Sequence, residues 1–143
     1  MEDAKNERAQ LGRSLRRVVL LGFAYALAGN GVLYASYYNS GIIDSGYLVC
    51  ALLAVAFAVP VVLLFRNRHW YFPAFIFLFW IPFSVLIGYL LSLALPMTMD
   101  SYEFGLLLVY YLILNVIAIV VGLALGMIVN ALWLLGSRLK AGK

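Results

Sequence analysis

The residues best able to bind a charged ligand lie in one short basic and aromatic segment. Arg66 and Arg68 come directly before Trp70 and Tyr71. An arginine guanidinium can hold a phosphate with two parallel hydrogen bonds, and the indole beside it can stack on a sugar ring. We therefore interpret Arg66 and Arg68 as ligands of a lipid phosphate, with these neighbours at the headgroup interface: Asn67, His69, Trp70, Tyr71 and Phe72. The alternative reading is that both arginines only set topology and attract anionic headgroups in general.

Three asparagines form a second candidate set, because they lie within long apolar runs. Asn30, Asn115 and Asn130 can line an intramembrane polar path and donate hydrogen bonds to the hydroxyls of a moving headgroup. They can equally bridge neighbouring helices, since a buried amide needs a partner. Helix packing is the more common use of such residues, and the sequence leaves both readings open.

No combination of residues in this chain predicts catalysis or metal binding. Cys50 lies within an apolar run and His69 at its basic edge, so they cannot form a nucleophile and base. His69 has no second histidine with which to share a metal. We therefore expect no catalytic residue, no metal, no cofactor and no enzymatic activity. A proton-coupled exporter is also disfavoured, because the apolar runs contain no carboxylate.

Composition places these residues in a membrane protein. Of 143 residues, 66% are hydrophobic and only 11% are charged, and the mean hydropathy is +1.01. A soluble domain is about half apolar and about a quarter charged. A soluble enzyme, a disordered chain and a nucleic-acid-binding domain are thereby disfavoured, despite the net charge of +4.

Four apolar stretches are long enough to cross a bilayer, which takes about 20 residues of helix. None of them contains Asp, Glu, Lys, Arg or His. We expect one transmembrane domain over residues 1–143, with a basic N-terminus (1–17), a basic C-terminus (136–143) and spans at about 18–38, 47–65, 71–95 and 104–135. The fourth stretch exceeds the bilayer thickness, so it should tilt or emerge at one end.

The basic residues all fall on one predicted side of the membrane. They precede the first span, lie between the second and third, or follow the fourth: Lys5, Arg8, Arg13, Arg16, Arg17, Arg66, Arg68, Arg138, Lys140 and Lys143. By the positive-inside rule, both termini and the middle loop are expected in the cytoplasm. The predicted fold class is an all-α bundle of four transmembrane helices, N-in and C-in, arranged as two tandem helical hairpins.

Small residues indicate where these helices approach each other. Gly122 and Gly126 have the four-residue spacing that lets two backbones come close. Gly22, Ala26 and Gly29 share one face of the first span. We expect both sets to serve helix packing.

The middle loop, Asn67-Arg68-His69-Trp70-Tyr71-Phe72, follows a second span with the pattern N-R-x-W-x-F. This string resembles the GtrA-like family of small four-span membrane proteins. The run from Arg16 to Gly22 is similar to the basic, apolar and glycine opening of that family. In the second half Val129-Asn130 resembles a later motif of the family, with Ala131 in place of its aromatic residue.

The resemblance implies a carrier or presenter, in effect a flippase, of a polyprenyl-phosphate-linked sugar for cell-envelope polysaccharide glycosylation. The expected partners are the lipid itself and either further copies of the chain or a membrane glycosyltransferase. The expected location is the plasma or inner membrane, and no nucleic acid is involved. The alternative is a non-transporting adaptor, subunit or immunity protein that binds a membrane partner through its small-residue helix faces. A weaker third reading is an asparagine-lined ion channel.

Overall fold

The computed structural model describes residues 1–66, 71–95 and 101–143, and every element in these ranges is a helix. The elements are α1 (Glu2–Tyr38), α2 (Ser40–Asp44), α3 (Gly46–Leu64), α4 (Ala74–Ala94) and α5 (Ser101–Ala141). Among the described residues, all but the short α2 are long and apolar enough to span a membrane. The prediction of an all-α chain with four helices long and apolar enough to span a membrane is confirmed for the described residues.

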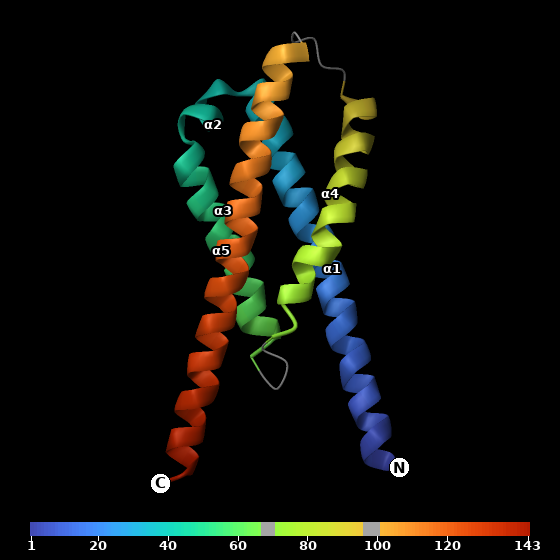
Figure 1. The fold of residues 1–143 in the computed structure, drawn as a ribbon, viewed down its shortest axis with the longest axis vertical. Helices are drawn as coiled ribbons and strands as arrows, with labels where there is room; N and C mark the ends of the chain where they lie inside the picture. Colours follow the sequence, from blue (N-terminus) through green and yellow to red (C-terminus); the bar gives the residue numbers. More distant parts are fainter. Residues whose placement is uncertain (67–70, 96–100) are drawn as a thin grey trace.

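The two outer helices are longer than the predicted spans. α1 continues through the basic segment 1–17, and α5 continues through much of the basic segment 136–143. At about 1.5 Å per residue they measure roughly 55 and 60 Å, about twice the hydrocarbon thickness. Both therefore extend beyond a bilayer, and Figure 1 shows their free ends, the two chain termini, at the same end of the bundle.

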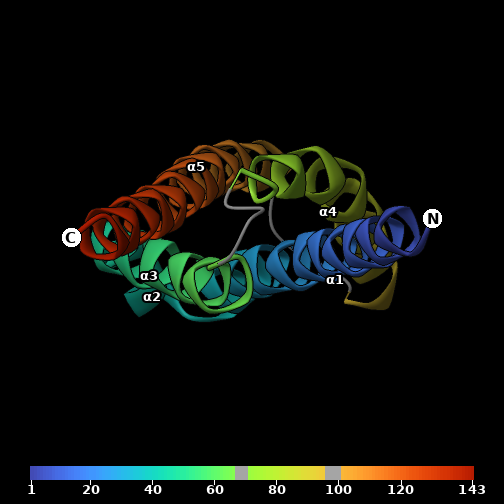
Figure 2. The same cartoon turned by 90° about the horizontal axis from the view of Figure 1, so that it is seen from below.

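The main contacts do not join consecutive spans. α1 packs along α4 and α3 packs along α5, whereas α1 with α3 and α4 with α5 touch over much shorter stretches. Figures 1 and 2 show these two pairs side by side. The short links predicted that consecutive helices pack together as two hairpins. The main contacts instead join α1 to α4 and α3 to α5. A short link keeps two helix ends close, but it does not make the rest of the helices pack.

Within each pair the two helices run parallel. Along α1 and α4 the contacts ascend together, from Gly22 against Phe79 to Tyr34 against Gly88. Along α3 and α5 they ascend from Cys50 and Leu114 to a contact near Val61. Each span of the first half thus packs against the span of the second half that runs in the same direction.

Glycines make these parallel contacts possible. A methyl group added to Gly122 would lie 2.7 Å from the Ala54 carbonyl oxygen and 2.8 Å from the Phe57 Cβ. One added to Gly126 would lie 2.5 Å from Val61 Cγ1. The Gly122 and Gly126 face is therefore occupied by α3.

The first-span glycines are equally close to neighbours. A methyl group on Gly22 would lie 2.9 Å from the Phe79 Cβ on α4, and one on Gly29 would lie 2.6 Å from the Asn115 side-chain oxygen on α5. Ala26 is fully buried beside them. These five small residues lie at helix contacts inside the bundle.

We expect Gly122→Ala to lower the free energy of unfolding by about 1–3 kcal/mol, because the new methyl group meets a backbone carbonyl that cannot turn away. The measurement is the midpoint of unfolding in mixed micelles titrated with sodium dodecyl sulfate. Gly31→Ala is the control, since its methyl group would meet nothing within 4 Å. Equal midpoints for Gly122→Ala and wild type would show that the α3–α5 contact is looser than described.

Candidate functional site

Arg66 is the described member of the predicted phosphate-binding pair, and an aromatic ring holds it in place. It is exposed just beyond α3, and its guanidinium carbon lies 4.5 Å from the centre of the Trp133 ring on α5. A cation over an indole face at an exposed site gains about 0.5–1 kcal/mol. The stacked guanidinium keeps its N–H donors at its edge, so it can still receive an anion.

A second arginine at the same end of the bundle serves the fold. The Arg17 guanidinium donates a 3.0 Å hydrogen bond to the Leu64 carbonyl, at the last residue of α3. A cation at a helix C-terminus satisfies a free carbonyl and opposes the helix dipole. Arg17 therefore ties the basic end of α1 to the point where the chain leaves α3 towards Arg66.

The remaining predicted headgroup residues lie partly outside the described ranges. Asn67, Arg68, His69 and Trp70 fall in the gap between residues 66 and 71, so the structure does not place them. Tyr71 is exposed, and its ring centre lies 5.3 Å from that of the buried Phe72. These two residues lead directly into α4.

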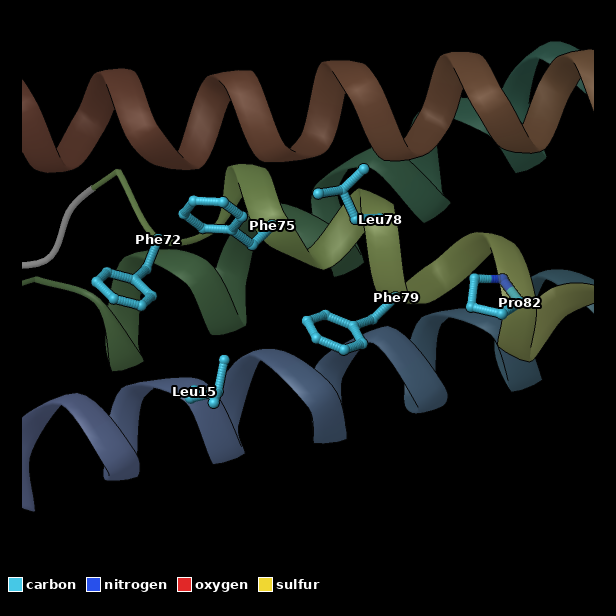
Figure 3. Close-up of a pocket in the computed structure, with 6 residues that line it drawn as sticks. All are labelled: Leu15, Phe72, Phe75, Leu78, Phe79 and Pro82. Carbon is cyan, nitrogen blue, oxygen red and sulfur yellow. The ribbon is translucent and has the colours of Figure 1, made fainter.

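An apolar groove lies on the α1–α4 pair, near this end of the bundle. Its volume is about 460 Å³, and its lining residues are Leu15, Phe72, Phe75, Leu78, Phe79 and Pro82. Figure 3 shows Leu15 rising from α1 towards Phe72 and Phe79, whereas Phe75 and Leu78 lie farther from α1. This volume lies within the range of known ligand pockets, and the rings offer flat apolar faces.

Asn30 joins α1 to α4 through side-chain hydrogen bonds. Its side-chain N–H groups donate to the Ala26 carbonyl at 2.9 Å and, across the contact, to the Ser84 hydroxyl at 3.1 Å and carbonyl at 3.2 Å. One turn further along, the Tyr34 hydroxyl donates to the Gly88 carbonyl at 3.1 Å.

Asn115 and Asn130 make similar bridges from α5. The Asn115 amide donates to the Tyr111 carbonyl at 3.0 Å and to the Gly29 carbonyl on α1 at 3.4 Å. The Asn130 amide donates to the Val61 carbonyl on α3 at 3.0 Å. The three asparagines thus contact three different helix pairs, and the structure does not bring them together along one path.

Some polar atoms within the described part of the chain keep unused hydrogen-bonding capacity. These buried atoms without a partner are the Asn115 and Asn130 side-chain oxygens and the Tyr111 hydroxyl. An asparagine oxygen can only accept a hydrogen bond. The two oxygens, together with the Tyr111 hydroxyl, are therefore available to accept from a water or hydroxyl that enters the bundle.

Sequence reasoning missed four residues that shape this region: Leu15, Arg17, Tyr25 and Trp133. Leu15 and Arg17 lie in the predicted basic N-terminus (1–17), where the sequence predicts for Arg17 a topological role and a place in the family-like opening but no contact with another helix. The Tyr25 hydroxyl donates to the Phe57 carbonyl and so joins α1 to α3. An aromatic residue near the basic end of the fourth span was a usable signal for Trp133, because such residues mark the interface.

Among the described residues, no group of three His, Cys, Asp or Glu side chains could hold a metal ion. Scans against protein-family models, curated proteins and solved structures each found no match to this chain. The resemblance to the GtrA-like family accordingly stays a prediction that rests on residues 16–22, 67–72 and 129–130.

We expect Asn30→Ala to destabilise the bundle by about 0.6–2 kcal/mol, the range for interhelical hydrogen bonds in membranes. A double-mutant cycle with Ser84→Ala, read from unfolding midpoints in micelles, isolates the hydrogen bond between the two side chains. Unchanged stability of Asn30→Ala together with lost lipid binding would instead assign Asn30 to a ligand path.

Proposed function

We propose that this chain is an integral membrane carrier or presenter, acting as a flippase or its equivalent, of a polyprenyl-phosphate-linked sugar used in cell-envelope polysaccharide glycosylation. The observation that carries the proposal is that an exposed, ring-supported arginine and an apolar aromatic groove lie at the same end of the bundle. Arg17, two residues after the groove residue Leu15, donates to the carbonyl of Leu64, two residues before Arg66. A lipid with an anionic head and a long chain needs both kinds of contact.

In this proposal Arg68 holds the phosphate and Arg66 assists it. Trp133 restricts the Arg66 side chain, so less conformational entropy is lost when an anion binds. Asn67, His69, Trp70, Tyr71 and Phe72 form the headgroup interface. The family resemblance supplies the polyprenyl chain and the sugar, and the arginine chemistry supplies the phosphate.

The proposed orientation places both termini and the loop between α3 and α4 in the cytoplasm, in a plasma or inner membrane. All ten Lys and Arg residues lie in these three segments, which supports this direction under the positive-inside rule. The two termini at one end of the bundle fit it as well. The lipid phosphate would then be received at the cytoplasmic leaflet.

Presentation of the lipid is better supported than transfer through the middle of one chain. The amides of Asn30, Asn115 and Asn130 are engaged in helix contacts, so a headgroup that crossed between these helices would have to break them. We propose that the chain works as a homo-oligomer or with a membrane glycosyltransferase, and that it performs no catalytic step itself. The adaptor alternative gains no support, because the Gly122 and Gly126 face packs against α3.

We expect Arg68→Ala to lose most of the polyprenyl phosphate retained by the wild-type protein, and Arg66→Ala to lose part of it, because each removes a cation from the phosphate. Native mass spectrometry of the protein extracted with its own lipids measures the retained species. Arg138→Ala removes an equal charge near the end of α5 and should leave retention unchanged.

Arg68→Lys should rescue little, since an ammonium cannot form the paired hydrogen bonds of a guanidinium. Full retention in Arg68→Ala would overturn the assignment of roles. A wild-type chain that carries only bulk phospholipid would overturn the function itself.

A further inference from the structure

The groove begins near the basic end of the bundle and follows the first half of α4. The groove residues that belong to α4 or directly precede it run from Phe72, before the helix, to Pro82 in the middle of the helix. From Ala74 to Pro82 the helix rises about 12 Å, less than half of the hydrocarbon thickness. The groove is therefore placed to take the part of a lipid chain nearest its headgroup.

The wall formed by α1 continues beyond the groove. Leu11 and Arg8 precede Leu15 by four and seven residues, so all three share one face of the helix. α4 begins only at Ala74, and a methyl group on Gly12 would meet nothing within 4 Å. Leu11 and Arg8 are exposed there, and this face of α1 is open where the groove ends.

The apolar groove and the cation on this face of α1 match the two parts of a lipid, its apolar chain and its anionic head. The lining is apolar along α4, and the next cation on the groove side of α1 lies about 10 Å beyond Leu15, at Arg8. Arg13, in contrast, lies on the opposite face and its Nε donates to the Ala9 carbonyl of its own helix. A chain in the groove would thus lead its anionic head towards Arg8.

The lining favours an isoprenoid chain over a straight acyl chain. Each isoprene unit has a flat, methyl-substituted double bond, which matches the rings of the exposed Phe75 and the half-buried Phe79. Phe75 and Leu78 are exposed, so a chain can enter sideways from the bilayer.

We propose that the groove between α1 and α4 binds the headgroup-proximal isoprene units of a polyprenyl phosphate, and that Arg8 binds its anionic head from the side of α1. This inference rests on the proposed function and extends it: it locates the chain and adds a cation on α1 to those of the loop. The membrane lipid is then held on the outside of the bundle.

The test is a titration of the full-length purified protein with undecaprenyl phosphate in detergent, read by native mass spectrometry, with dioleoyl phosphatidylglycerol in a parallel series. Leu15→Trp and Leu78→Trp fill the groove from its two walls. Leu20→Trp is the control, because Leu20 is another exposed α1 leucine that does not line the groove. Arg8→Ala is compared with Arg13→Ala.

Both groove-filling variants are expected to weaken undecaprenyl phosphate binding about tenfold, with Leu20→Trp unchanged, Arg8→Ala weakened and Arg13→Ala unchanged. Binding that survives both tryptophans would overturn the groove assignment and leave the proposed function standing. Equal loss of both lipids would overturn the isoprenoid preference and identify an ordinary acyl groove. A wild-type protein that does not bind undecaprenyl phosphate at all would overturn the proposed function and this inference together.

Discussion

Hydrogen bonds from side chains to backbone carbonyls of neighbouring helices are the interactions on which this bundle depends. Lipid offers no water to polar groups and no hydrophobic drive between helices, so close packing and polar bridges must hold them. Tyr25, Asn30, Asn115 and Asn130 each donate to a carbonyl on another helix. Such bonds need backbones in near contact, which the glycines permit. The two parallel pairs and their joining contacts follow from this combination.

This use of the asparagines limits what the interior can do. Their donors are engaged in the packing of the helices, and the acceptors left over, on Asn115 and Asn130, lie on different helix contacts. The features suited to a lipid lie instead at the outer surface and at the basic end. The groove is on the side of the α1–α4 pair, and Arg66 is exposed above Trp133. The proposed presenting role at the membrane surface would use these features without opening the bundle.

Cations at the basic end therefore divide into two kinds. Arg17 closes the end of α3 and Arg13 bonds to its own helix, so both contribute to structure. Arg66 is oriented but keeps donors available, and Arg8 stands on an exposed face. All of them count equally in a charge rule for topology, and only their contacts show which ones the fold engages and which keep donors for the proposed ligand.

The sequence by itself determined the number of helices able to span a membrane, because the cost of placing a polar or charged residue in lipid is a local property. It came within a few residues of both ends of α3 and α4, of the last residue of α1 and of the first residue of α5. It did not predict that α1 begins at Glu2, since residues 2–17 lack an apolar pattern although most of them are good helix formers. Only the tertiary structure decided that α1 pairs with α4 and α3 with α5, which asparagine reaches which carbonyl, and that Leu15 and Phe79 share a groove. These relations join residues dozens of positions apart, as Asn30 joins Ser84, and depend on how two whole helix surfaces fit. No local preference along the chain encodes that fit.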